Sequence, residues 1–286
     1  MYIHIDDASY WYELYGKGHE ETVVLFHGFT SRTTTWEPFI KDFMKGFQVL
    51  VIDLPGHGKT KTPPRTMHTF AADFEQMLAI LKIESCHLLG YSMGGRTALS
   101  FALLYPERVK SLVMESASPG LRTKKERKIR ISADEVLIKR LLNDGLENFV
   151  NYWEDIPLFD TQKSLPKSVQ SKIREERLSQ HEDGLACSLK YMGTGMQPNW
   201  WEHLKSFLKP VLLLAGEKDS KFININKEMA ELLPKRKFKI VENAGHAIHV
   251  EQPEKFGKIV LEFIQEIDVV ENKGGAVKND STMGKS

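Results

Sequence analysis

Three side chains that could act together in proton transfer stand at the ends of apolar segments. Ser92 lies in the run Gly-Tyr-Ser-Met-Gly at 90–94, between an apolar stretch and a helix-forming one, and Asp219 and His246 each follow a later apolar run. A serine hydroxyl is too weak an acid to react alone, so an imidazole must accept its proton and a carboxylate must hold that imidazole in one tautomer. The sequence therefore predicts a catalytic triad of Ser92, His246 and Asp219.

Two backbone amides complete the expected site. The segment 23–29 predicts a strand and a His-Gly loop that bring the N–H of Phe29 near that of Met93. Such a pair forms an oxyanion hole, in which the loss of one donor costs about 3 to 4 kcal/mol of transition-state stabilisation. For His27 and His57, which lie in glycine-flanked loops, we expect roles in loop structure rather than in catalysis.

Each triad residue also has a purely structural interpretation. Ser92 alone is an ordinary turn serine, Asp219 a helix cap, and His246 a hydrogen-bonded histidine near a strand end. Their shared position at strand ends, in the order Ser, Asp, His, favours catalysis. His249 follows His246 by three residues, but no cluster of carboxylates or thiolates accompanies it in the sequence, so we expect no metal site.

The composition fits a globular enzyme with one large core and an insertion. The chain has 286 residues, 41% of them hydrophobic, and its 39 Lys and Arg nearly balance its 38 Asp and Glu, so we expect no nucleic-acid partner. No apolar run approaches the roughly 18 residues of a membrane span, and Asp6 and Asp7 argue against a signal peptide. We therefore expect a cytoplasmic protein without membrane insertion, monomeric or weakly homo-oligomeric, with Cys86 and Cys187 reduced.

Alternating strand-like and helical segments predict an α/β fold with a mostly parallel sheet covered by helices on both faces. An antiparallel hairpin is expected over 2–15. Apolar residues at helical spacing predict helices over 69–81 and 253–267. The further strands are expected near 22–27, 48–53, 85–89, 109–115, 210–215 and 237–241.

One segment interrupts the alternation. Residues 119–209 are helical and charge-rich, which predicts a helical cap inserted after the sixth strand, on the side of the sheet where Ser92 lies. The core is then expected over 1–118 and 210–267. The stretch 268–286 lacks apolar periodicity and contains Gly274 and Gly275, so we expect a disordered tail there.

Several motifs together resemble one branch of the α/β-hydrolase superfamily, the 2-succinyl-6-hydroxy-2,4-cyclohexadiene-1-carboxylate synthases of menaquinone (vitamin K2) biosynthesis. The resemblance extends to about residue 267. His27-Gly28-Phe29, Asp53-Leu54-Pro55-Gly56-His57-Gly58 and the serine motif are shared across the superfamily. The resemblance also includes Pro119-Gly120-Leu121. Its more specific parts are Arg96 after the double glycine, Asp219-Ser220-Lys221-Phe222, and His246-Ala247-Ile248-His249.

The resemblance implies a lyase reaction, the elimination of pyruvate from 2-succinyl-5-enolpyruvyl-6-hydroxy-3-cyclohexene-1-carboxylate, without an acyl-enzyme, cofactor or metal. Ser92 serves there as a base toward carbon. The small substrate carries three carboxylates, which call for permanently charged bidentate donors. Arg96 lies one helical turn beyond Ser92. The resemblance adds Arg130 and Arg177 from the cap, with Arg127 or Arg174 as the choices if the alignment shifts by one turn. It also assigns pocket aromatics, for which core packing is the alternative: Tyr91, Trp153 and Phe159.

Two other functions remain open at this stage. A carboxylesterase or carbon-carbon bond hydrolase on the same fold would use Ser92 covalently, through an acyl-serine. A catalytically silent binding module is the third interpretation, and the intact triad argues against it.

Overall fold

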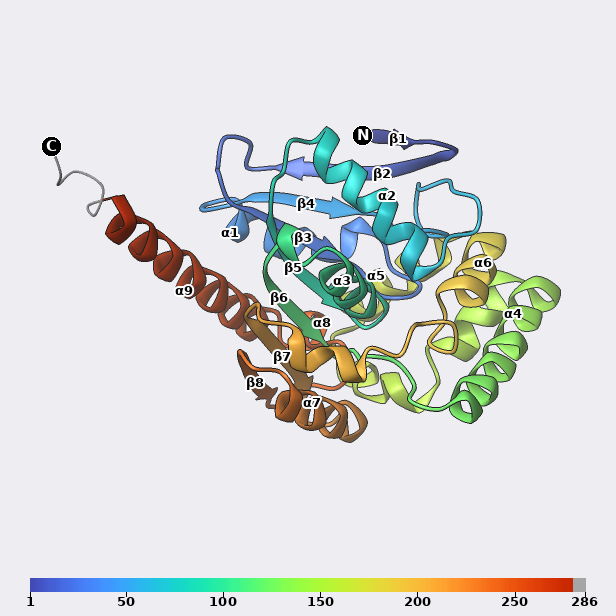
Figure 1. Cartoon of the computed structure of the whole chain (residues 1–286). Coiled ribbons are helices and arrows are strands. Elements are labelled where there is room, and N and C mark those ends of the chain that lie inside the picture. The colour runs from blue at the N-terminus through green and yellow to red at the C-terminus, as the bar shows by residue number, and fades with distance from the viewer. Residues whose placement is uncertain (280–286) are drawn as a thin grey trace, which may run out of the picture.

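The computed structural model describes the backbone of residues 1–279 and the side chains of residues 1–267. Its centre is an eight-stranded sheet with the order β1-β2-β4-β3-β5-β6-β7-β8 (Figure 1). The β1 and β2 strands form the expected antiparallel hairpin, and β2 pairs antiparallel with β4, while all later pairs are parallel. The strands are β1 Tyr2–Ile5, β2 Ala8–Tyr15, β3 Thr22–Phe26, β4 Gln48–Ile52, β5 Cys86–Tyr91, β6 Val109–Glu115, β7 Val211–Gly216 and β8 Arg236–Val241.

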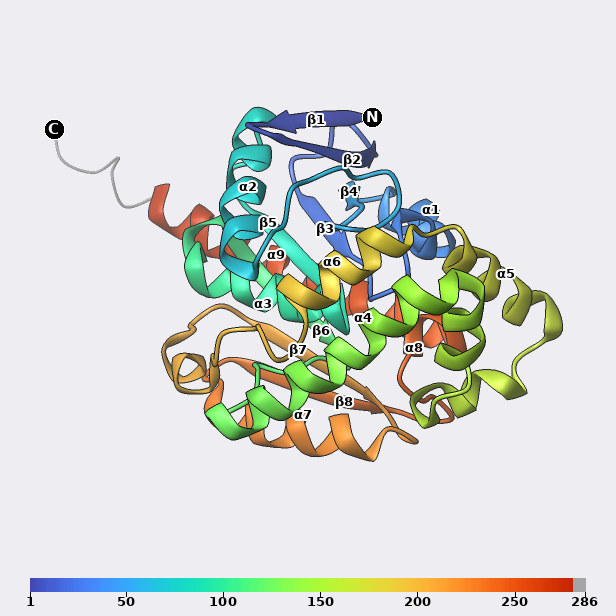
Figure 2. The ribbon, with the colours of Figure 1, turned by 90° about the vertical axis from the view of Figure 1, so that its right-hand side faces the viewer.

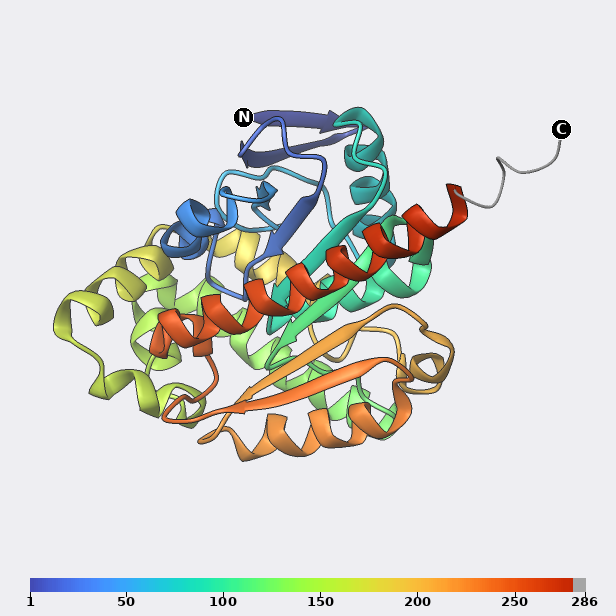
Figure 3. The same cartoon turned by 90° about the vertical axis from the view of Figure 1, so that its left-hand side faces the viewer.

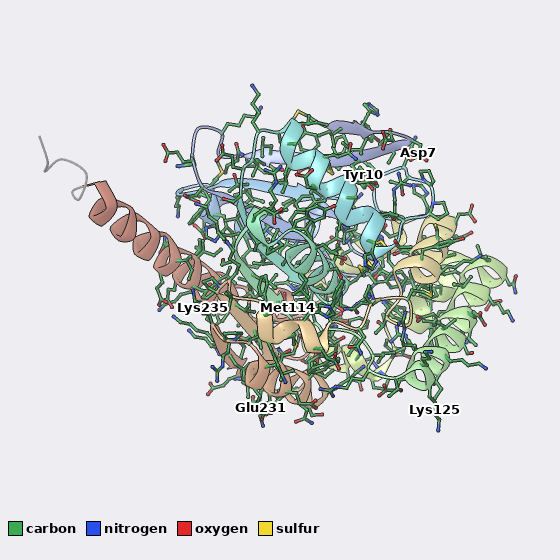
Figure 4. All side chains as sticks on the ribbon, in the orientation of Figure 1. Asp7, Tyr10, Met114, Lys125, Glu231 and Lys235 are labelled. Carbon is green, nitrogen blue, oxygen red and sulfur yellow. The ribbon has the colours of Figure 1, made fainter. Side chains whose placement is uncertain are left out.

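Helices cover both faces of this sheet, as an α/β chain requires. Successive residues of a strand point to opposite faces, and in β3 Val24 packs with one apolar cluster and Leu25 with the other. The first cluster lies under α2 (Met67–Ile80), α3 (Met93–Leu104) and α7 (Ser220–Leu232). The second lies under α1 (Glu37–Phe43) and α9 (Pro253–Asn279), which crosses the sheet in Figure 3. Figure 4 shows Met114 of β6 within this packed centre.

Between β6 and β7, all the regular secondary-structure elements are helices, joined by loops. These are α4 (Lys124–Trp153), α5 (Lys167–Leu178), α6 (Glu182–Met192) and the short 3-10 segments Pro157–Ser164 and Trp201–Ser206. They lie in front of the strands when the molecule is viewed from their side (Figure 2). The long helix α4 begins with a capping box, in which Thr123 and Glu126 satisfy each other's backbone N–H groups. We call residues 119–209 the cap segment.

The end of α9 differs from the expectation. The sequence predicts a helix to about residue 267 and a disordered tail over 268–286, whereas the helical backbone continues to Asn279. Once a helix is nucleated, each further residue adds one hydrogen bond at little cost, so Gly274 and Gly275 do not end it. The rest of the expected tail, 280–286, lies outside the described residues.

Candidate active site

Ser92 occupies a sharp turn between β5 and α3. Its backbone φ is 50°, a value that L residues rarely adopt, and its N–H donates to the carbonyl oxygen of Glu115 at 2.8 Å. The turn is possible because the residues two positions before and after Ser92 are glycines. A Cβ on Gly90 would lie 2.3 Å from the Gly94 carbonyl oxygen, and one on Gly94 would lie 2.1 Å from that of Phe26. This geometry holds the serine hydroxyl above the ends of the strands.

The three predicted triad residues lie within hydrogen-bond distance of one another. The Nε2 atom of His246 is 3.0 Å from Ser92 Oγ, and its Nδ1 is 2.8 Å from Asp219 Oδ2. Asp219 caps the start of α7, where its other oxygen accepts the N–H of Phe222 at 3.2 Å. Because this second bond fixes the carboxylate, His246 is held with Nε2 toward the serine. Asp219 and His246 are both buried.

The expected oxyanion loop lies beside the serine turn. Met93 is the first residue of α3, so its N–H has no carbonyl partner within the helix. Phe29 follows β3 in the neighbouring loop, and its ring contacts Trp153 of the cap segment with centroids 5.4 Å apart. Both residues border the same cavity as Ser92.

His27 and His57 hold this loop in shape, as the sequence predicts. The Nε2 atom of His27 accepts the N–H of Leu54 at 2.9 Å, and that of His57 accepts the N–H of Thr30 at 3.2 Å. An imidazole can accept in this way only when neutral. Burial lowers the pKa of His27 to about 4, and burial together with the charge of His27 lowers that of His57 to about 3.

The triad opens into a cavity of about 530 Å³ between the sheet and the cap segment. Arg96, one turn beyond Ser92, and Arg130 of α4 both line it. Arg96 is buried and donates to the carbonyl oxygen of Met192 at 3.0 Å, while Nε of Arg130 donates to Asp134 at 2.8 Å. Burial and the like charge of Arg130 lower the pKa of Arg96 to about 9, so the guanidinium stays charged at neutral pH.

The remaining arginines have other surroundings. The buried Arg177 does not border the cavity of Ser92 but two adjoining ones, and its guanidinium packs on the Phe159 ring at 4.7 Å from the centroid. Arg127 donates to the Gly195 carbonyl at 3.0 Å, and Arg174 pairs with Glu154 at 2.6 Å. Neither of these two alternatives lines the cavity of Ser92.

The three predicted aromatics border the cavity beside His246. The ring centroids of Tyr91 and Phe159 lie 5.4 Å and 6.2 Å from that of His246, and Trp153 packs edge-on against Phe159 at 5.8 Å. The indole N–H of Trp153 is buried with no hydrogen-bond partner among the described residues.

Two cations of the cavity have no role assigned by the sequence analysis. Lys221 lies two residues after Asp219, inside a motif that the analysis quotes, and withdrawal from solvent and the charge of Arg130 lower its pKa. Arg122 lies over the Trp201 ring at 3.6 Å and pairs with Glu228 at 2.7 Å. The nearness of Lys221 to Asp219 in the chain is the signal that could have revealed it.

The described residues contain no group of three or more His, Cys, Asp or Glu side chains placed to hold a metal ion. Over the same part of the chain, no helix has the length and apolar character to cross a membrane.

Comparison with known proteins places this chain in a family. The sequence model of the alpha/beta hydrolase fold matches residues 21–253. A putative 2-succinyl-6-hydroxy-2,4-cyclohexadiene-1-carboxylate synthase of Bacillus subtilis is 45% identical over 260 residues, which cover 88% of this chain and 93% of the relative. The synthase of that name in Salmonella typhimurium is 30% identical over 81% of this chain and 89% of its own length.

Solved structures agree with the sequence comparison. The structure of MenH from S. aureus is 37% identical, with a TM-score of 0.87 over 91% of this chain and 98% of its own. A thermophilic esterase from Thermogutta terrifontis, solved with malate bound, is 26% identical, with a TM-score of 0.80 over 91% of this chain and 94% of its own. On the strength of these matches along nearly its whole length, the chain belongs to the alpha/beta hydrolase fold family and, within it, to the 2-succinyl-6-hydroxy-2,4-cyclohexadiene-1-carboxylate synthases.

Proposed function

We propose that this enzyme eliminates pyruvate from 2-succinyl-5-enolpyruvyl-6-hydroxy-3-cyclohexene-1-carboxylate to form the product after which its family is named. The observation that carries the proposal is a triad that opens into a cavity lined by the cations Arg96, Arg130 and Lys221. A hydrolase of neutral esters has no need of these charges, whereas a substrate with three carboxylates does.

The proposed reaction uses the triad as a base. His246 accepts the Ser92 proton, and Ser92 Oγ removes a proton from the carbon next to the succinyl carbonyl of the substrate. The N–H groups of Phe29 and Met93 stabilise the negative charge on that carbonyl oxygen. The electron pair then forms the C2–C3 double bond of the ring, the C3–C4 double bond shifts to C4–C5, and the bond from C5 to the enolpyruvyl oxygen breaks. The enolate that leaves takes up the proton from His246 at its methylene carbon and becomes pyruvate.

Residues of the core and of the cap segment together supply substrate binding in this proposal. Arg96 and Arg130 bind carboxylates of the substrate, and Tyr91, Trp153 and Phe159 shape the apolar wall around its ring. Arg177 reaches this wall through Phe159, so direct contact between Arg177 and the substrate stays a prediction. The cytoplasmic location and the monomeric or weakly oligomeric state also stay predictions.

A direct test supplies the enolpyruvyl substrate and follows pyruvate release. We expect turnover by the native chain and a loss of several orders of magnitude in Ser92→Ala, whose fold should be unchanged. A native chain that releases no pyruvate from this substrate would contradict the proposal.

Hydrolysis through an acyl-serine is the second candidate, favoured by the similarity to the Thermogutta esterase and by the same triad. The two reactions leave different products. Hydrolysis would incorporate heavy oxygen from labelled water into the retained product and give a Ser92 adduct in the mass spectrum during turnover, whereas elimination gives neither.

A further inference from the structure

A second carboxylate and imidazole pair lies beneath the triad, and the proposed reaction does not use it. Glu115, at the end of β6, has no solvent-exposed surface. Its carboxylate accepts the backbone N–H of His249 at 3.0 Å, and its two oxygens lie 2.9 Å and 3.0 Å from Nδ1 of the same residue. Burying a carboxylate costs several kcal/mol unless it is fully paired, so this arrangement calls for a reason.

Glu115 contacts both segments that carry the reacting side chains. Its backbone carbonyl accepts the N–H of Ser92 at 2.8 Å, which ties it to the serine turn. Its carboxylate holds His249, three residues after His246. This contact ties Glu115 to residues 245–249, which we call the histidine loop. Glu115 thus links the segment that carries Ser92 with the segment that carries His246.

The histidine loop is also held from its other side. One oxygen of Glu251 accepts the N–H of Gly245 at 2.7 Å, and the other accepts the N–H of Ala247 at 3.2 Å. These two amides flank His246. Glu251 therefore fixes the shape of the loop, while Glu115 and His249 fix its position relative to the serine turn.

The His249 ring has little freedom to move away from Glu115. Its centroid lies 4.6 Å from that of Tyr91 and 4.9 Å from that of Trp36, and its Nε2 is 3.3 Å from Thr35 Oγ1. Tyr91 in turn packs 5.4 Å from His246. Neither Glu115 nor His249 lines the cavity of Ser92, so neither side chain is placed to touch the substrate there.

We propose that Glu115 and His249 are positioning residues for the reaction: the pair holds the His246 imidazole at hydrogen-bond distance from Ser92 Oγ. The proposal rests on the proposed function for its substrate assay. Because a misplacement of about 1 Å in a catalytic group can cost on the order of 100-fold in rate, loss of the pair should lower kcat about 10- to 100-fold. KM should change little, since the substrate contacts are elsewhere.

The test compares two replacements of His249. The Nδ2 of an asparagine lies where histidine carries Nδ1, so His249→Asn retains the donor to Glu115, whereas His249→Leu removes it. We expect a 10- to 100-fold lower kcat in His249→Leu, and recovery of most of this loss in His249→Asn. His68→Gln is the control and should keep nearly native turnover, because it changes an exposed histidine that contacts neither Glu115 nor His249.

A second measurement separates this proposal from the substrate assignment. A fluorophosphonate probe reacts with Ser92 only when His246 accepts the serine proton, whatever the natural substrate is. Labelling should slow in His249→Leu and recover in His249→Asn. Equal labelling rates in the two variants, or kcat losses that simply follow a lower unfolding midpoint, would overturn the proposal, and failure of the native chain to release pyruvate would contradict only the proposed function.

Discussion

Arg96 combines two properties that are costly in a folded protein, a positive charge and nearly complete burial. Its side chain donates to one backbone carbonyl, and among residues 1–267 the nearby carboxylate of Asp134 pairs with Arg130 and acts on Arg96 only through its charge. A buried guanidinium in this state gains most when a ligand brings the missing negative charge. At the scale of single residues, we therefore expect this cavity to favour an anionic ligand.

We expect Arg96→Ala to lower kcat/KM for the enolpyruvyl substrate by about 30- to 1000-fold, since a charge-assisted bidentate contact to a carboxylate is worth on the order of 2 to 4 kcal/mol. Arg96→Lys should recover only part of the loss, because lysine keeps the charge but not the planar fork. Lys221→Met should show a smaller loss. Steady-state kinetics with the anionic substrate and with a small neutral ester provide the measurement.

Arg127→Ala is the matched control for this series. Arg127 is close to Arg130 on α4, but it binds the Gly195 carbonyl outside the cavity of Ser92, so its loss should leave kcat/KM nearly unchanged. Equal losses on the anionic and neutral substrates in Arg96→Ala would show that Arg96 supports the fold rather than the substrate.

The sequence predicts the role of a residue best where the residue follows a recognisable strand. Ser92, Asp219 and His246 follow strands, and since parallel strands end at the same edge of a sheet, the order of the chain was enough to bring them together. The roles of Lys221 and Glu115 were not predicted. The pairing of Glu115 with His249 joins residues 134 positions apart, which no local pattern reveals.

At the scale of elements, the turn from β5 to α3 determines where the nucleophile and one oxyanion donor lie. The turn brings α3 against β3 so closely that position 94 has no room for a side chain. The glycine spacing predicted this turn from the sequence, because only glycine tolerates such a close backbone approach. The end of α9 was not predicted, since the tail lacks the apolar pattern on which the helix assignment depended.

Gly94→Ala should destabilise the protein by on the order of 2 to 3 kcal/mol and lower its activity, because the new Cβ would meet the Phe26 and His27 carbonyl oxygens at 2.1 Å and 2.6 Å. Backbone atoms cannot swing aside as a flexible side chain does. Gly46→Ala is the control, since a Cβ there would meet nothing within 4 Å. Urea unfolding compares the two variants, and similar midpoints would contradict the close packing of α3 on β3.

At the scale of the whole molecule, the two layers of helices leave the site at one edge of the sheet, under the cap segment. The loops that close this edge depend on neutral histidines. His27 ties the end of β3 to the loop after β4, and His57 ties that loop back to Thr30. Figure 1 shows β3 and β4 side by side, so these two bonds connect adjacent strand ends.

These histidines predict a loss of stability in mild acid. Their pKa values of about 4 and about 3 in the folded protein lie below the value of about 6.5 in the unfolded chain, so below that pH the unfolded state binds more protons. Each protonating histidine then contributes a loss of about 1.4 kcal/mol per pH unit. Urea unfolding measured between about pH 7 and about pH 5 should show that the free energy of unfolding decreases as the pH decreases.

Two variants test whether these histidines cause the effect. His27→Gln, whose amide oxygen can accept the Leu54 N–H without titrating, should show a shallower slope of the free energy of unfolding against pH. His68→Gln, at an exposed position, should keep the native slope. An unchanged slope in His27→Gln would mean that other groups cause the acid sensitivity.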